Sequence, residues 1–429
     1  MSRPAARWAG VPLLLALVTG GCGSGDDDRE GQAGGGSPER IRVQVSGEPE
    51  ETKVYAALAR AFENQRRDVT VEVVEIASKG DHLARLSTSF AAGSPPDVFL
   101  VNYREYSQFV TRGAVAAIEA PLAERDVDLS AYYDQPVDAF TYDVELQCMP
   151  QNVSSLVVYY NRAVFAAAGV PEPADDWTWD DFVSTARELT AGEVRGAGID
   201  ASIIRLAPFV WSNGGDVVDD LEQPTRLTLD EPAAREAVQD VVDLVREGSV
   251  PTEEELAAQD LQTRFVTGKL GMLLSSRREV PPLREVAGLD FDVAPVPRRV
   301  DPVTILHSDA YCLSAGGDAQ DAAADFVAFA TGEAGQRLAA LSGRTVPSLR
   351  SVAESPAFLD PSRAPSRNQV FLDGISSMRR TPVVPVWPEV EDIVEEQMTR
   401  AFYDESGDLD AVLAEIDRRT RPVLARSDP

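Results

Sequence analysis

Apolar residues near the start of the folded chain recur with two different periods, and each period predicts one kind of element. Apolar runs rich in β-formers predict strands at residues 41–45, 69–76 and 97–102. Apolar residues three and four positions apart predict helices between them, at residues 50–65 and 83–90. Strands that alternate with helices favour a mainly parallel sheet with helices on both faces. The pattern therefore predicts an α/β protein.

Polar and aromatic residues lie at the carboxyl ends of the first and third of these strands. In sheets of this kind, ligands bind beyond the carboxyl ends of the strands. This position singles out four candidate binding residues: Ser46, Glu48, Asn102 and Tyr103. A loop-capping or surface role is the alternative for each of them.

The stretch 147–161 reads as a link between two lobes. Pro150 ends any helix and holds the residue before it in an extended conformation. A mostly polar run follows at residues 151–155, and residues 156–160 are apolar and rich in β-formers. We interpret the stretch as a strand that leaves one lobe, crosses an open polar patch and enters a second lobe. Grooves between lobes are where ligand pockets concentrate, so the pattern predicts a two-lobed receptor with its hinge here.

Further elements follow along the chain. A helix is expected from residue 179 to residue 189, with Thr178 as its N-cap and Asp181 three residues on. Residues 303–315 resemble a second crossover, which returns to the first lobe, and a third passage begins at Val346. Three crossings make each lobe discontinuous in the sequence.

The first 22 residues have the pattern of an export signal. Arg3 and Arg7 give a charged start, residues 11–18 are apolar, and small residues precede Cys22. This ending resembles the lipobox of bacterial lipoproteins, although Thr19 stands where that family prefers Leu. The resemblance implies that Cys22 is lipidated and holds the protein on the extracytoplasmic face of the bacterial cell membrane. Simple secretion after cleavage nearby is the alternative.

The expected parts of the chain are a signal peptide, a lipidated cysteine with a flexible tether, two lobes and three hinge crossovers. They lie at 1–21 for the signal peptide, 22–38 for the tether, 39–149 and 310–346 for lobe 1, 150–309 and 347–429 for lobe 2, and near 150–154, 303–310 and 344–350 for the crossovers.

Composition narrows the range of partners. The chain has 40 basic and 70 acidic residues and a formal net charge of −30, so nucleic acid is a poor partner, since it requires a clustered basic surface. An acidic total still permits a locally basic pocket. Outside the cytoplasm, Cys148 and Cys312 can form a disulfide; two buried free thiols are the alternative.

Six short motifs, taken in order, resemble one family. They are Gly93-Ser94-Pro95-Pro96-Asp97-Val98, Pro150 through Asn161, Trp179-Asp180-Asp181-Phe182, Asn213-Gly214-Gly215, Phe265 through Met272, and Gly343-Arg344-Thr345-Val346-Pro347. Each motif alone is weak, but together they span roughly residues 40–400 and resemble the extracellular solute-binding proteins of family 1. That family includes many sugar receptors of ABC importers. The resemblance implies a type II periplasmic-binding-protein-like fold, in which two α/β lobes with mixed, mainly parallel sheets close over a ligand.

The same resemblance implies which residues line the pocket. Carried over by position, the ligand-binding residues are Ser46, Glu48, Asn102, Tyr103, Gln151, Asn152, Ser154, Trp211, Ser276, Arg278, His307, Asp309, Arg344 and Trp387. Many relatives have an aromatic residue in place of Arg278 and glycines in place of residues 307–309. This departure permits an acidic sugar, a phosphorylated polyol or another anionic solute.

These residue types suit a receptor for hydroxylated solutes. Planar Asp, Asn and Arg groups can each hold two neighbouring hydroxyls, and aromatic rings cover the apolar face of a sugar. Trp211 and Trp387 are the stacking candidates, with a purely structural role as the alternative for Trp387. His307 is one of two histidines and is either a ligand contact or a satisfied hydrogen-bonding group.

The sequence thus predicts a monomeric extracytoplasmic solute-binding lipoprotein that serves ABC permease transmembrane subunits and uses no cofactor or metal. One alternative is a receptor that feeds a sensor kinase. Another is a secreted glycoside hydrolase, although no G-x-S-x-G, H-E-x-x-H or C-x-x-C pattern is present.

Overall fold

The structure is a computed structural model, and it describes residues 38–47, 49–404 and 407–427. The predicted signal peptide, Cys22 and Glu48 lie outside the described residues. Within the described part, no helix is both long enough and apolar enough to cross a membrane.

The first sheet contains six strands in the order β2-β1-β3-β13-β4, with β7 beside β13. Their bounds are Glu39–Ser46 for β1, Val69–Ile76 for β2, Val98–Asn102 for β3, Val115–Ala116 for β4, Cys148–Pro150 for β7 and Asp309–Ser314 for β13. Strands β2 and β3 are parallel to β1, as predicted, and β13 is antiparallel to β3. Successive residues Val43, Gln44 and Val45 point to opposite faces, and all are buried, so both faces of the sheet are covered.

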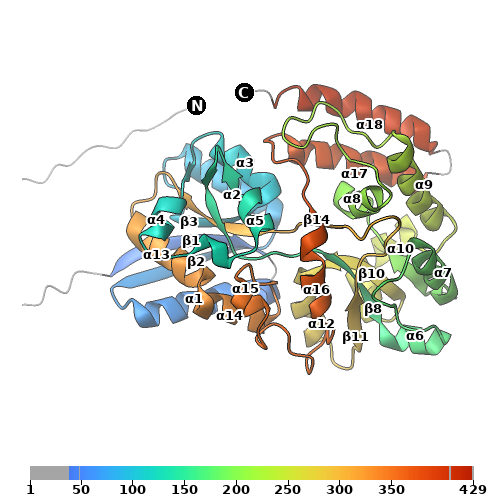
Figure 1. Cartoon of the computed structure of the whole chain (residues 1–429), viewed down its shortest axis with the longest axis horizontal. Helices are drawn as coiled ribbons and strands as arrows, with labels where there is room; N and C mark the ends of the chain where they lie inside the picture. The colour runs from blue at the N-terminus through green and yellow to red at the C-terminus, as the bar shows by residue number, and fades with distance from the viewer. Residues whose placement is uncertain (1–37, 48, 405–406, 428–429) are drawn as a thin grey trace, which may run out of the picture. The chain divides into compact units, whose positions relative to one another are not determined.

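The main helices of this lobe each follow a strand of the sheet in the sequence, except α14, which follows α13 and packs on α1 and α13 (Figure 1). They are α1 (Pro49–Gln65), α2 (Lys79–Ala91), α3 (Tyr103–Val110), α13 (Gln320–Thr331) and α14 (Glu333–Ser342). Helices α1 and α2 both contact β1 and β2. Helix α1 begins one residue before the predicted start and ends at the predicted residue, and its buried positions Tyr55, Leu58 and Phe62 lie on one face.

The second sheet contains four strands in the order β11-β8-β10-β9. They are β8 (Leu156–Asn161), β9 (Arg195–Gly198), β10 (Leu270–Ser276) and β11 (Phe291–Ala294). Helices around it include α6 (Arg162–Ala168), α7 (Trp179–Leu189), α8 (Ile203–Ser212), α9 (Pro232–Arg246), α17 (Trp387–Tyr403) and α18 (Leu409–Leu424). Helix α7 has the predicted capping box: Asp181 N donates to Thr178 Oγ1 over 3.3 Å, and Thr178 N donates to Asp181 Oδ2 over 2.8 Å.

The remaining short elements connect these parts. The helices are α4 (Glu119–Ala123), α5 (Asp134–Ala139), α10 (Glu253–Ala258), α11 (Leu261–Val266), α12 (Val280–Glu285), α15 (Arg350–Ala353) and α16 (Gln369–Asp373), with 3₁₀ turns η1 (Leu129–Ala131), η2 (Arg277–Glu279) and η3 (Ile375–Ser377). The strands are β5 (Thr141–Tyr142), β6 (Glu145–Leu146), β12 (Thr304–Ile305) and β14 (Met378–Arg379).

The two sheets are mixed, and their parallel part is smaller than predicted. Strand β8 is antiparallel to both β10 and β11, and β13 is antiparallel to β3, β4 and β7. Both β8 and β13 follow a crossover from the other sheet rather than a local helix. Each therefore enters its sheet from the hinge side and runs against its neighbours.

Three chain segments run side by side between the sheets. The chain passes from the first sheet to the second between β7 and β8, and it returns between β11 and β13. Ser154 and His307 exchange two backbone hydrogen bonds of 2.8 Å, and Val153 N donates to the carbonyl of Val346 over 3.0 Å. Asn152 and Pro347 form an isolated bridge. Backbone hydrogen bonds therefore join the three predicted crossover segments directly.

A disulfide joins Cys148 and Cys312, whose Cα atoms are 4.4 Å apart. The two cysteines face each other in the register of β7 and β13, and both are fully buried. The bond therefore fixes the strand that begins the first crossover to the strand that ends the second.

Candidate ligand-binding site

A cavity of about 320 Å³ lies where the crossovers meet the ends of the strands, and we call it the hinge cavity. Nine of the residues predicted for the pocket line it: Ser46, Asn102, Asn152, Ser154, Ser276, Arg278, His307, Asp309 and Arg344. The other described lining residues are Gly47, Ala77, Lys79, Arg104, Ile204, Arg205 and Arg277. The lining thus comes from elements of both sheets and from the crossovers between them.

Strand direction explains why distant residues meet here. Ser46 and Asn102 end the parallel strands β1 and β3, and Asp309 begins β13, which is antiparallel to β3. Asp309 therefore lies opposite Asn102, and Asn102 Nδ2 donates to Asp309 Oδ1 over 3.0 Å. Asn152 on the first crossover accepts from the backbone N of Asp309 over 2.8 Å through its Oδ1. Ligands of α/β sheets bind at this edge, beyond the carboxyl ends of the parallel strands.

Basic side chains surround this edge. Lys79 donates to the buried Glu105 over 2.8 Å, and Arg104 lies 3.5 Å from Glu391. Burial opposes the charge of Arg104, but the carboxylates of Glu391 and Glu105 outweigh that effect and raise its pKa. Arg104 therefore stays charged in the cavity lining.

Arg277 is a buried cation held by neutral groups. Its guanidinium lies 4.8 Å and 4.9 Å from the ring centroids of Phe358 and Phe371, and its Nε donates to the carbonyl of Gly343 over 3.0 Å. A further bond goes to the side-chain oxygen of Asn368. Burial lowers the pKa of Arg277 to about 9, so the side chain is still protonated at neutral pH.

The positive charges around the hinge cavity disfavour the protonated form of His307. Burial lowers the pKa of His307 well below 6.5, and the positive charges of Arg104, Arg205, Arg278 and Lys79 lower it further. The imidazole is therefore neutral at physiological pH. Its Nε2 has no hydrogen-bond partner among the described residues, so this nitrogen can contact a solute.

Four predicted pocket residues do not line the hinge cavity. Tyr103 is buried, and its hydroxyl bonds to Thr381 over 3.1 Å; Gln151 bonds instead to the hydroxyl of Tyr55 over 3.1 Å. Trp211 and Trp387 lie in the apolar core of the second sheet, where they are 3% and 0% exposed. Glu48 is not described by the structure.

The two tryptophans bind other parts of the protein. The guanidinium of Arg379 lies 5.0 Å from the ring centroid of Trp211. Trp387 Nε1 donates to Glu391 over 2.8 Å, and Glu391 in turn faces Arg104 of the cavity lining. Trp387 is therefore one step removed from the cavity and orients one of its basic residues. A large aromatic ring follows the same apolar pattern whether it stacks on a sugar or packs in a core, so the sequence did not separate the two roles.

Four basic lining residues were missed in the sequence. Lys79 follows the end of β2, so the strand-end rule applied to that strand would have found it. Arg104 lies two residues beyond Asn102, in the first turn of α3. Nothing in the sequence singles out Arg205 or Arg277, because only packing turns α8 and η2 toward the cavity.

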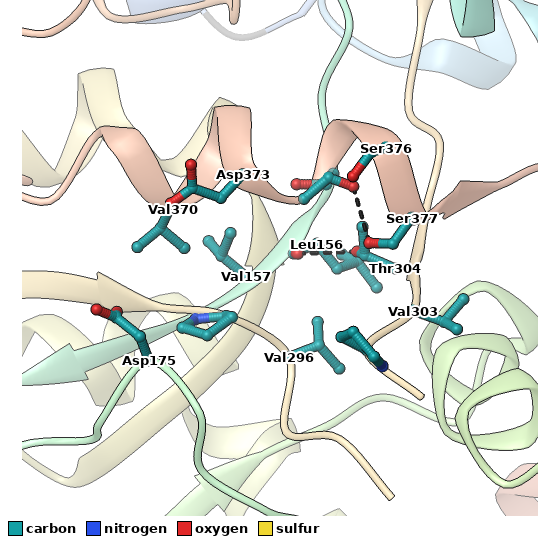
Figure 2. A pocket seen from close by; sticks show the side chains of 14 residues that line it. Leu156, Val157, Asp175, Val296, Val303, Thr304, Val370, Asp373, Ser376 and Ser377 are labelled. Atoms are coloured by element: carbon teal, nitrogen blue, oxygen red, sulfur yellow. Dashed lines mark hydrogen bonds between the residues drawn. The ribbon is translucent and has the colours of Figure 1, made fainter. Parts of the chain in front are cut away.

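A second cavity, of about 220 Å³, lies on another side of the same crossovers (Figure 2). Its apolar lining includes Val157, Val296 and Val370, and its described lining has no basic side chain. Ser154 lines the hinge cavity, whereas Ser155 lines this one, because successive side chains of an extended segment point to opposite sides. The lining of this second cavity contains none of the predicted pocket residues. The hinge cavity is therefore the better candidate.

Comparisons with known proteins agree with this architecture. The sequence model of the bacterial extracellular solute-binding protein family matches residues 57–365. The galactooligosaccharide-binding protein of Bacillus subtilis (strain 168) is 22% identical over 394 residues, which cover 89% of this chain and 87% of that protein.

Solved structures share the fold. An ABC substrate-binding protein of Listeria monocytogenes, solved with cycloalternan, superposes with a TM-score of 0.81 at 24% identity and covers 90% of this chain and 99% of its own. UgpB from Mycobacterium tuberculosis, solved with glycerophosphocholine, gives a TM-score of 0.79 at 20% identity and covers 91% and 99%. The predicted two-lobed α/β fold is confirmed. Because the family match spans well over half of the chain, the protein belongs to the bacterial extracellular solute-binding protein family.

Proposed function

We propose that this protein is the extracytoplasmic receptor of an ABC importer. It captures a small hydroxylated solute, a sugar or a sugar derivative, and delivers it to the permease subunits in the membrane. Membership in the solute-binding family supports the receptor role. The relatives described above are named for, or were solved with, galactooligosaccharide, cycloalternan and glycerophosphocholine, all of which carry hydroxyl or phosphate groups.

One observation carries the proposal: the lining of the hinge cavity comes from both sheets and from the crossovers. A solute in this position contacts both lobes fully only when they are closed. Its differential affinity for the closed form shifts the population toward closure. Bending is absorbed near residues 151–154 and 307–309, where the crossovers run side by side.

The lining suits hydroxyl groups. Asn102, Asn152 and Asp309 offer planar groups that can each hold two neighbouring hydroxyls, and charge-assisted bonds to Asp309 are the stronger ones. Ser154 and Ser276 add hydroxyls that both donate and accept. The chemistry is recognition alone, and we propose no catalytic step.

The proposal includes a lipid anchor at Cys22, after removal of residues 1–21. Acyl chains on Cys22 and the tether of residues 22–38 hold the receptor near its permease. Replacement of Cys22 by Ala should move the protein from the membrane fraction to the medium. Retention of the Cys22→Ala variant on membranes would contradict the anchor.

The receptor role is tested by blocking the cavity from an exposed position. Ala77 lines the hinge cavity but is exposed, so Ala77→Trp places a bulky ring there without disturbing the core. Ala92→Trp, at the exposed far end of α2, is the matched control. Both variants and the native protein are screened by thermal denaturation against sugars, polyols, sugar acids and their phosphates.

A bound solute should raise the unfolding midpoint of the native protein and of Ala92→Trp, but not of Ala77→Trp. X-ray scattering should show a smaller radius of gyration with the same solute. A solute that stabilises Ala77→Trp as strongly as the native protein would remove the hinge cavity from the proposal. A radius of gyration that no binding solute changes would remove lobe closure.

A further inference from the structure

The charge of the hinge cavity is opposite to that of the chain. The whole sequence has 70 acidic and 40 basic residues. The described lining of the cavity has six basic side chains and one carboxylate, Asp309. Three further carboxylates, on Asp200, Glu105 and Glu391, pair with Arg205, Lys79 and Arg104 from behind the lining. Among the residues that the structure describes, basic groups therefore outnumber acidic ones even when these partners are included.

Three helices begin at the cavity and add to this charge. Ala77 and Lys79 flank Ser78, the N-cap of α2; Asn102 is the N-cap of α3. Ile204 and Arg205 lie in the first turn of α8. A helix N-terminus carries the positive end of its macrodipole, equivalent to roughly half an elementary charge, and favours a bound anion. Backbone and side chains thus act in the same direction.

Two side chains of the lining, Ser154 and Arg205, have hydrogen-bonding atoms without a partner among the described residues. Ser154 is 3% exposed, and its Oγ has no hydrogen-bond partner in the described part of the chain. The side chain of Arg205 is 13% exposed, and its Nε lies 3.4 Å from Oδ2 of Asp200. Neither Nε nor Nη1 of Arg205 makes a hydrogen bond to any residue that the structure describes. A buried donor without an acceptor is costly. Oxygen atoms of an anionic solute would satisfy these donors with charge-assisted bonds.

The lining also lacks the platform for a neutral sugar. Among the described lining residues there is no Phe, Tyr or Trp. The two tryptophans with the expected sequence positions, Trp211 and Trp387, are buried in the core of the second sheet. Apolar stacking on a sugar ring is therefore weak here, and electrostatic recognition is strong.

We propose that the hinge cavity selects solutes that carry an anionic group, a phosphate, sulfate or carboxylate, on a hydroxylated skeleton. This inference rests on the proposed receptor function and names its class of substrate. The anionic group lies against Arg205 and Ser154, between the first turns of α2 and α8, and the hydroxyls face Asn102 and Asp309. Basic residues attached to the two sheets face one another, so the anion also relieves their repulsion as the lobes close.

The test compares neutral and charged solutes that share a skeleton. Calorimetric titration is carried out with glycerol and glycerol 3-phosphate, and with glucose, glucose 1-phosphate, glucose 6-sulfate and glucuronate; inorganic phosphate and sulfate report on charge alone. We expect the charged member of at least one set to bind at least ~10-fold more tightly than its neutral counterpart, with affinity that falls as salt is added. The preferred member of the glucose set distinguishes phosphate, sulfate and carboxylate.

Two variants locate the anion. Arg205→Gln should weaken binding of the charged solute by about 10- to 100-fold, which corresponds to the loss of one or two charge-assisted hydrogen bonds, and leave the neutral solute unaffected. Lys79→Gln, on a side chain that is 59% exposed, should weaken it less. Arg40→Gln is the control, because it changes the net charge equally at an exposed pair with Glu72 on the far end of β1.

The outcomes separate this inference from the receptor function. Neutral sugars that bind as tightly as their charged counterparts would overturn the anion preference and leave the receptor function intact. Equal losses for Arg205→Gln and Arg40→Gln would also overturn it. If neither neutral nor charged solutes bind or change the radius of gyration, the receptor proposal and this inference both fail.

Discussion

Removal of the disulfide between Cys148 and Cys312 should destabilise the protein strongly. The bond closes a loop with a sequence separation of 164 residues. In the chain-entropy treatment a loop of this length contributes about 5 kcal/mol, and removal of native disulfides typically costs about 2–5 kcal/mol. Both cysteines are fully buried, and Cys148→Ala with Cys312→Ala also leaves small voids, which adds to the loss.

Guanidinium denaturation of the native protein and of the double alanine variant measures this difference. The midpoint should fall in the variant, and reductant added to the unfolded native protein before refolding should lower it similarly. The variant itself should not respond to reductant, which is the internal control. Equal midpoints for the native protein and the variant would refute the reasoning that the bridge between β7 and β13 constrains the unfolded chain.

Three further changes have defined outcomes. Trp211→Ala should lower the free energy of unfolding by about 3–5 kcal/mol, because a core ring is removed, while a solute still binds the folded variant; a selective loss of binding in titration would contradict its place in the core. The native-state pKa of His307 is lowered, so the unfolded chain takes up more protons below about pH 6.5 and the free energy of unfolding falls as the pH falls. In denaturant titrations, His307→Gln should therefore lose less stability than the native protein between about pH 7 and pH 5. If the free energy of unfolding depends on pH equally in both proteins, the buried imidazole is not neutral. Thr178→Ala removes one half of the capping box on α7 and should cost about 1 kcal/mol in thermal unfolding, whereas Thr178→Ser should cost little; equal losses would show that the cap bond contributes nothing.

The strand-end residues show how far local pattern reaches toward the site. Ser46 and Asn102 follow apolar runs whose period alone predicts β1 and β3, and parallel pairing then brings both to one edge. The crossover at residues 151–155 was likewise visible as a polar interruption between two runs of β-formers. These features are local, because a strand's period and a turn's chemistry depend on residues close in sequence.

The sequence by itself determined the α/β class, the two-lobed plan and the polar edge where strands and crossovers meet. The tertiary structure alone decided that Trp211 and Trp387 face a core, that β8 and β13 run against their neighbours, and that Arg205 and Arg277 join the cavity. The physical reason is that the pattern of apolar and charged residues in one segment decides whether it forms a helix or a strand. That pattern does not decide which other segment it packs against. Which ring becomes buried and which cations converge depends on the orientation of segments a hundred or more residues apart.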